Sequence, residues 1–199
     1  MSHAGYSAEV AKAGRRCTPT PNAKQGDQPI VHIIRNASEG HTTLQCAQWV
    51  PRPLEEVFSF FADAANLERI TPPFLRFHVR AMSTPAIQHG TEISYRLRLH
   101  GLPIAWTSRI EEWEPPYRFT DVQIRGPFRL WHHHHEFASE PWGTCLRDTV
   151  HYRAPFAWIQ RILRLSWVDR DLERIFRYRQ QIIERLFDDT RPQTSTRSC

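Results

Sequence analysis

Four consecutive histidines, His132–His135, stand inside the segment RLWHHHHEF, residues 129–137. Histidine exchanges protons near neutral pH and is a common metal ligand, so the run could serve acid–base chemistry or a metal site. The run is internal and lies in strand-like sequence, which argues against a purification tag. Neighbouring residues of a strand point to opposite faces, so a strand here would divide the four histidines into two pairs.

The two pairs have different companions. His133 and His135 would share a face with two large aromatic residues, Trp131 and Phe137. The other two histidines would share the opposite face with Glu136. The first face has the composition of a cavity wall, whereas the second is most simply a solvated face.

A metal site on the first face would need three or four converging ligands. His133 and His135 would supply two, and Asp121 or Asp148 from a neighbouring strand could supply a third. No further histidine or cysteine pairs with them at a recognisable spacing, and none of the four cysteines forms a C-x-x-C motif. We therefore expect no metal and no other cofactor, and we expect these histidines to bind carboxylates.

An acid–base interpretation uses the same residues. A carboxylate beside a histidine orients the ring and stabilises its charged form. A buried network of this kind could transfer protons, orient the polar group of a ligand, or only stabilise the fold. The acid–base candidates are His133, His135, Asp121 and Asp148, and Tyr95 or Tyr152 could add a hydrogen-bond donor.

The strand that precedes the histidines has two conflicting faces. Phe119, Asp121 and Gln123 lie on one face, whereas the face that carries Val122 and Ile124 is the more apolar. If the first face points inward, its polar side chains must find partners, because burial of an unpaired polar group is costly.

The rest of the body alternates in a way that predicts its elements. Residues 41–50 read as a strand, and apolar spacing after two prolines predicts short helices over 53–63 and 64–70. Period-two alternation separated by turn residues then predicts further strands. Their ranges are 77–82, 90–101, 102–117, 118–126, 129–139 and 143–155. From Ser166 the spacing becomes helical and predicts one long C-terminal helix.

This order predicts an α+β fold. A curved antiparallel sheet of six to seven strands would wrap around the long C-terminal helix, with two short helices after the first strand. One helix cannot fill the whole concave face, so we expect a small-molecule cavity between the helix and the sheet. The composition predicts a disordered leader over residues 1–29 and a flexible tail over residues 190–199. The ligand-binding domain is expected between them, over residues 30–189.

Composition narrows the classes of partner. The net charge is +5, and 26 Lys and Arg residues interleave with 21 Asp and Glu residues, so we expect no nucleic-acid binding. No apolar run is long enough for a membrane span or a secretory signal, so we expect a cytoplasmic protein without stable membrane insertion. Neither a G-x-G-x-x-G loop nor a G-x-S-x-G elbow occurs.

Residues 41–188 resemble the SRPBCC superfamily, whose helix-grip fold is shared by START lipid-transfer domains, pollen allergens and polyketide cyclase/dehydrases. Bacterial ligand-binding members have the pattern F-x-D-x-Q-x-x-G-P, then W-x-H-x-H-x-F, then D-x-V-x-Y-x-x-P. Relatives carry glycines after that last proline, where this chain has residues 156–158, Phe-Ala-Trp. The matching positions are Phe119, Asp121, Gln123, Gly126, Pro127, Trp131, His133, His135, Phe137, Asp148, Val150, Tyr152 and Pro155.

The resemblance implies binding of a hydrophobic or aromatic small molecule such as a lipid, a polyketide or a quinone-like compound. The alternative is a cofactor-free polyketide cyclase or dehydratase that uses a His/Asp acid–base pair. A third class is an interaction protein for quinone or respiratory components. The sequence leaves open the ligand, the oligomeric state and whether a reaction occurs. The expected ligand-binding residues are Tyr95, Trp106, Asp121, Gln123, Trp131, His133, His135, Phe137, Asp148 and Tyr152.

Overall fold

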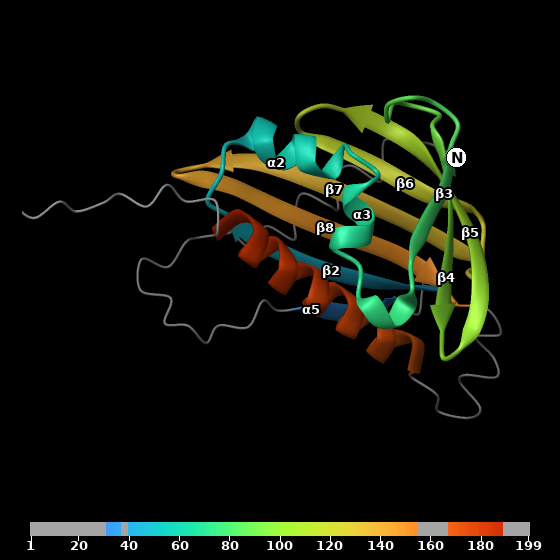
Figure 1. Ribbon diagram of the computed structural model, residues 1–199. Helices are drawn as coiled ribbons and strands as arrows, with labels where there is room; N and C mark the ends of the chain where they lie inside the picture. Colours follow the sequence, from blue (N-terminus) through green and yellow to red (C-terminus); the bar gives the residue numbers. More distant parts are fainter. Residues whose placement is uncertain (1–30, 37–39, 155–166, 189–199) are drawn as a thin grey trace, which may run out of the picture.

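The computed structural model describes residues 31–36, 40–154 and 167–188. These residues form one antiparallel sheet with helices in front of it (Figure 1). The sheet order is β1-β2-β8-β7-β6-β5-β4-β3, so β3 to β8 form a continuous meander. The strands are β1 (His32–Asn36), β2 (His41–Val50), β3 (His78–Met82), β4 (Glu92–Leu99), β5 (Leu102–Glu114), β6 (Arg118–Arg125), β7 (Leu130–Glu140) and β8 (Gly143–Arg153).

The helical elements follow the predicted positions. Pro53 immediately precedes the first helix, where its fixed φ suits the start of a helix. The long last helix contacts β2 and lies across the sheet in Figure 1. The described helical elements are α2 (Leu54–Phe61), α3 (Asn66–Arg69), the 3-10 helix η1 (Pro73–Leu75) and α5 (Trp167–Asp188).

Helix α5 is amphipathic. Its buried residues recur every three to four positions, which is the spacing of one helical face. The apolar ones among them contribute to two clusters, one that includes Phe58 and Phe137 and one around Leu44 and Tyr152. The buried residues of α5 are Val168, Leu172, Phe176, Gln180, Ile183 and Phe187.

The α+β helix-grip architecture is confirmed, with one difference in the strand count. The described sheet has eight strands rather than six to seven, because β1 was not recognised. Its sequence HIIRN is short, and only Ile33 and Ile34 are apolar, so it carries little alternation. The predicted leader, the whole predicted tail and the expected helix start at Ser166 lie outside the described residues.

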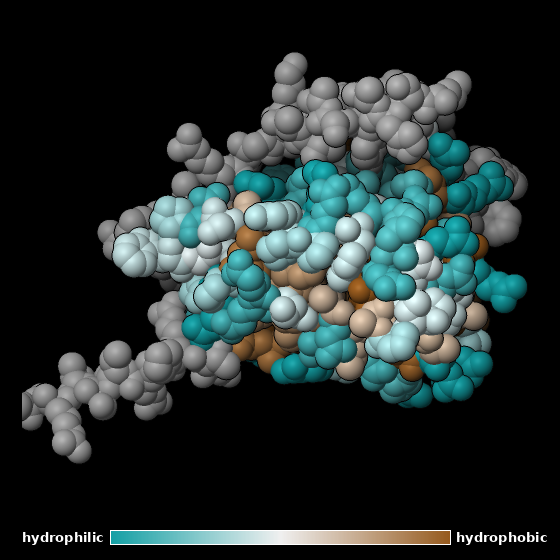
Figure 2. Space-filling view, turned by 90° about the horizontal axis from the view of Figure 1, so that it is seen from above, coloured by the Kyte–Doolittle hydropathy of each residue, from teal (hydrophilic) through white to brown (hydrophobic). Residues whose placement is uncertain are grey.

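The surface seen from above in Figure 2 is mostly hydrophilic, and its hydrophobic residues form small separate patches. Among the helices of residues 31–36, 40–154 and 167–188, none combines the length and the apolar character needed to cross a membrane.

Candidate functional site

Strand alternation and sheet register together assemble the predicted polar residues. In the register between β6 and β7, Asp121 lies opposite His133 and Phe119 lies opposite His135. In the register between β7 and β8, His135 lies opposite Asp148. Directly opposed residues share a face of the sheet. The His133 ring lies 5.5 Å from the ring of Phe176 in α5, so the face with the motif residues is the one that points toward this helix.

Two imidazole rings lie between two carboxylates in this network. His133 places Nε2 3.0 Å from Asp148 Oδ1 and Nδ1 3.5 Å from Asp121 Oδ2. His135 places Nδ1 2.8 Å from Asp148 Oδ1 and Nε2 3.4 Å from Asp121 Oδ2. The ring centroids are 3.8 Å apart with an interplanar angle of 39°. All four ring nitrogens therefore face a carboxylate oxygen.

The contacts at the two carboxylates differ in quality. The contact between His133 Nε2 and Asp148 has hydrogen-bond geometry. The short contact of His135 Nδ1 does not have hydrogen-bond alignment, so this nitrogen counts as unsatisfied in the described structure. The two contacts to Asp121 are long for hydrogen bonds between charged or polar groups.

Further polar groups support the two aspartates. Ser108 Oγ donates a hydrogen bond to Asp121 Oδ1 at 3.0 Å and accepts one from Trp106 Nε1 at 3.0 Å. The thiol of Cys46, which is buried and free, points to Asp148 Oδ2 at 3.8 Å. Each carboxylate is thus oriented by a neighbour from a different strand.

Arg179 of α5 brings a positive charge to the Asp148 side. Its guanidinium lies over the Phe61 ring, 5.2 Å from the centroid. In the described part of the chain, its buried Nε and Nη2 have no hydrogen-bond partner. Helical spacing from the buried residues Phe176 and Ile183 places Arg179 on the inward side of α5.

These surroundings shift the pKa values of the network. Burial alone would raise the pKa of Asp148, but the Arg179 charge, the hydrogen bond from His133 and the close contact of His135 hold it well below its usual range. Burial also opposes ionisation of Asp121, yet contacts with His135 and His133 lower its pKa. Burial, with His135 as a second cause, lowers the pKa of His133 to about 4. The carboxylates are therefore ionised at neutral pH and His133 is neutral.

An aromatic wall adjoins the Asp121 side of the network. The Trp106 ring lies 5.1 Å from the Trp131 ring and 5.6 Å from the Phe128 ring, and Tyr95 lies 6.4 Å from Trp106. We call these four residues, Tyr95, Trp106, Phe128 and Trp131, the aromatic wall. Burial, and then the charge of Asp121, raise the pKa of Tyr95 above its usual range, so its hydroxyl remains a hydrogen-bond donor.

Gln123, one of the expected ligand-binding residues, is bonded to Phe128 through both ends of its side-chain amide. Its Nε2 donates to the Phe128 carbonyl oxygen at 2.7 Å, and its Oε1 accepts from the Phe128 N–H at 3.1 Å. These two bonds hold the turn that places Phe128 in the aromatic wall. In the described structure Gln123 therefore positions a wall residue.

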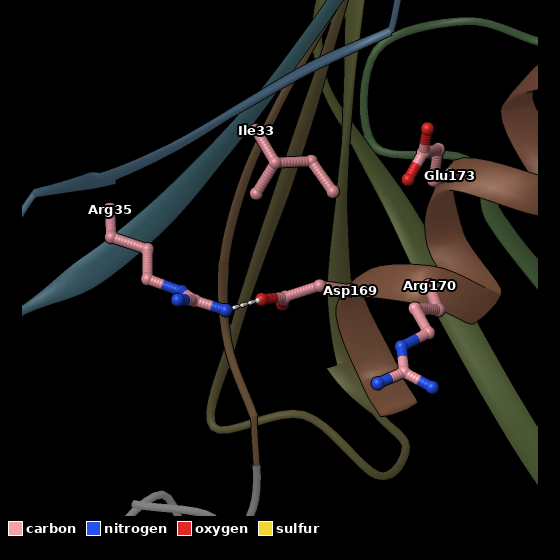
Figure 3. Close-up of a pocket in the computed structure, with 5 residues that line it drawn as sticks. All are labelled: Ile33, Arg35, Asp169, Arg170 and Glu173. Carbon is pink, nitrogen blue, oxygen red and sulfur yellow. Dashed lines mark hydrogen bonds and ion pairs between the residues drawn. The ribbon is translucent and has the colours of Figure 1, made fainter. Parts of the chain in front are cut away.

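Phe137 and Tyr152 also have packing roles. The Phe137 ring lies 5.3 Å from Phe58, inside the apolar cluster beneath α2. The Tyr152 hydroxyl donates to Asp169 Oδ1 at 2.6 Å and so ties β8 to the first turn of α5. Figure 3 shows the same Asp169 paired with Arg35 of β1.

The second histidine pair is less exposed than the sequence indicated. His132 and His134 are half-buried, whereas a solvated face was expected. Thr120 Oγ1 lies 2.9 Å from His134 Nδ1. Burial first, and then the charge of His151, lower the pKa of His134 to about 3. The correction follows from the other residues of this face, since Thr120 and Val122 are themselves buried.

A comparison of the sequence with models of protein families identifies the family of this chain. The model of the family described as polyketide cyclase / dehydrase and lipid transport matches residues 50–159, which is more than half of the chain. The chain belongs to this polyketide cyclase / dehydrase and lipid transport family. The match confirms the resemblance to the SRPBCC superfamily. No curated protein matches the sequence.

Solved structures of low sequence identity share the fold of this polyketide cyclase / dehydrase family member. The protein Ms6760 from Mycobacterium smegmatis is 17% identical with a TM-score of 0.58, and the match covers 81% of this chain and 100% of that chain. TTHA0849 from Thermus thermophilus is 19% identical with a TM-score of 0.56, and the match covers 75% of this chain and 99% of that chain. The di-domain ARO/CYC protein BexL from the BE-7585A biosynthetic pathway is 20% identical with a TM-score of 0.58. The match covers 77% of this chain and 52% of that chain.

Four residues of the site were not among the predicted site residues of this family member, namely Cys46, Ser108, Phe128 and Arg179. Ser108 could have been found, because alternation places it on the same face as Trp106. Arg179 could have been found from its helical spacing. Phe128 follows β6 in a turn, and its place in the aromatic wall depends on the fold of that turn, for which the sequence has no periodic signal.

Two surface grooves lie beside α5. One, of about 270 Å³, is lined by Ile33, Arg35, Asp169, Arg170 and Glu173 (Figure 3). The other, of about 540 Å³, lies between α5 and the segment that contains η1, with Phe74 and Tyr178 in its lining. Neither groove is lined by the Asp–His network or by the aromatic wall.

Proposed function

We propose that this chain binds a hydrophobic or aromatic small molecule, of lipid, polyketide or quinone-like chemistry, through the aromatic wall and the Asp–His network. Family membership supports a ligand-binding or cyclase role. Binding sites of this kind combine apolar and aromatic surface with a few convergent polar groups. Here the four rings supply the surface and Asp121 supplies the adjoining polar group.

The observation that carries the proposal is a difference in exposure within the network. The Asp121 side chain keeps 18% of its surface exposed, whereas His133 and His135 keep 6% and 4%. Asp121 is therefore the accessible end of a buried polar chain. Ser108 bonds it to Trp106, and its charge acts on the half-buried Tyr95. A ligand that packs on the rings would place its polar group against this carboxylate.

Native mass spectrometry of the purified full-length protein tests the proposal first. A mass that is lost on denaturation and matches an organic molecule is expected. Fluorescence titration with the apolar probe N-phenyl-1-naphthylamine then locates the site. Trp131→Ala should weaken probe binding roughly tenfold, or about 1.4 kcal/mol. Trp142→Ala is the matched control, because Trp142 is 88% exposed and lies in the turn between β7 and β8, at the opposite end of β7 from Trp131. Equal affinity of both variants and the wild type would contradict the proposal.

A second candidate function is a cyclase or dehydratase that uses the same network. The hydrogen bond between His133 and Asp148 favours it, because a buried carboxylate can orient an imidazole for proton transfer. His133→Asn would then abolish the loss of water from a linear poly-β-carbonyl substrate while probe binding stays unchanged. For a binding protein, the variant would change only affinity or stability.

A further inference from the structure

We propose that Asp121, His133 and His135 form a binding site for one divalent transition-metal ion. Each residue offers one ligand atom, and these atoms all lie within 4.8 Å of one another. Two imidazole nitrogens and one carboxylate oxygen are donors that suit Zn²⁺, Fe²⁺ and Co²⁺. The sequence alone favoured a site without metal, because no ligand motif of recognisable spacing is present.

The distances on the Asp121 side match the edges of a coordination polyhedron. Asp121 Oδ2 lies 3.5 Å from His133 Nδ1 and 3.4 Å from His135 Nε2. Both distances are long for hydrogen bonds. In a tetrahedral site with metal–ligand bonds of about 2.1 Å, neighbouring ligand atoms lie about 3.4 Å apart. Two of the three edges therefore match such a site, and all three ligand atoms lie within 4.8 Å of one another.

The number of hydrogen-bond donors on the two histidines also favours a cation beside Asp121. A neutral imidazole has one N–H and one lone pair. His133 Nε2 has hydrogen-bond geometry to Asp148 at 3.0 Å and is the natural position for the proton of that ring. His133 Nδ1 would then direct its lone pair toward the Asp121 carboxylate, which is repulsive. A cation between Asp121 and the two rings replaces this repulsive contact by metal–ligand bonds.

The residues around this set have the arrangement that orients metal ligands in proteins. Metal-bound histidines commonly direct the second ring nitrogen to a carboxylate, and bound carboxylates are themselves hydrogen-bonded. Asp148 takes the first role for both histidines, and Ser108 takes the second for Asp121. The Arg179 charge disfavours a cation on the Asp148 side and so selects the Asp121 side.

The set leaves a coordination position open. Three protein ligands with a free position are typical of metal sites that bind water or a small molecule. Asp121 is the accessible member of the set, and Ser108 connects it to Trp106 of the aromatic wall. An oxygen atom of a bound small molecule could occupy the open position. The site thus deepens the proposed function, but the metal and the apolar probe can be tested separately.

Titration of the full-length, chelator-treated protein with Co²⁺ tests the site. Bound Co²⁺ should produce visible d–d absorption that saturates at one equivalent and disappears when Zn²⁺ is added. Asp121→Asn, which is nearly isosteric, should weaken binding at least tenfold. The control is the double variant His132→Gln and His134→Gln, which removes the two histidines of the opposite face and should bind Co²⁺ like the wild type.

Three results would overturn the site: no Co²⁺ absorption in the wild type, unchanged binding in Asp121→Asn, or loss of binding in the double variant. If Asp121→Asn fails to fold by circular dichroism, X-ray absorption of the Zn²⁺-loaded wild type decides. Two imidazoles with oxygen ligands support the site, whereas a thiolate or a larger number of imidazoles refutes it. Probe binding by metal-free protein, measured in parallel, separates failure of the metal site from failure of the proposed function.

Discussion

Asp121 and Asp148 contact the same two imidazole rings from opposite ends. His133 and His135 each lie between them, with contacts of 2.8 and 3.0 Å to Asp148 and of 3.4 and 3.5 Å to Asp121. The asymmetry separates two roles. Asp148 is the buried acceptor that orients the rings, and Asp121 is the accessible group at the aromatic wall.

The buried acceptor makes a large contribution to stability. Asp148→Asn replaces an ionised acceptor of both histidines by a neutral amide and should lower the free energy of unfolding by about 2–4 kcal/mol. Urea denaturation at neutral pH measures the change. Glu111→Gln is the matched control, because Glu111 is exposed on β5, and it should change the value by less than about 0.5 kcal/mol. A control-sized effect of Asp148→Asn would show that the network does not stabilise the fold.

The contribution of Arg179 to the free energy of unfolding should depend on the charge of Asp148. Arg179→Met leaves a buried carboxylate without its main opposing charge and should destabilise the wild type by about 1–3 kcal/mol. In the Asp148→Asn background the same substitution should cost less, because the charge that it compensates is gone. A double-mutant cycle with urea measures this coupling, and additive effects would refute it.

Gln123 should affect ligand binding without touching the ligand. Gln123→Ala removes both hydrogen bonds that hold Phe128, whose ring lies 5.0 Å from Trp131. We expect N-phenyl-1-naphthylamine affinity to fall several-fold as the aromatic wall loosens. Gln88→Ala, on an exposed turn, is the control and should bind the probe like the wild type. If Gln123→Ala also binds normally, Phe128 is not needed in the wall.

The raised pKa of Tyr152 predicts that the protein loses stability at alkaline pH. Burial, and then the hydrogen bond to Asp169, raise the pKa of Tyr152 above its usual range. The unfolded chain ionises this tyrosine near pH 10, whereas the folded chain keeps the proton. Its contribution to stability is therefore complete below about pH 10 and is lost as pH rises toward the folded-state pKa.

Urea denaturation at about pH 8 and about pH 10.5 tests this sign. Tyr152→Phe should cost about 1–2 kcal/mol at the lower pH, because it loses the bond to Asp169, and should show a smaller further loss at the higher pH than the wild type. Tyr117→Phe is the control, since Tyr117 is 61% exposed and should leave the wild-type pH dependence in place.

Local pattern was enough to predict much of this protein. Period-two alternation assigned His133 and His135 to one face, because a strand admits no other arrangement of neighbours. Helical spacing predicted α5 and its buried face, and turn residues separated the strands of the meander. Asp121 and Asp148 were candidate partners of the histidines because they stand in neighbouring strand-like segments at positions of the family pattern, and a carboxylate orients an imidazole.

The tertiary structure decided what local pattern leaves open. Register placed Asp121 and Asp148 at opposite ends of the rings, and register depends on turns and bulges such as the shifts between β5 and β6. The fold of the turn after β6 made Gln123 a support of Phe128. Side-chain alternation states which face a residue occupies, but distances between strands and the docking of α5 arise only when the whole sheet closes around its core.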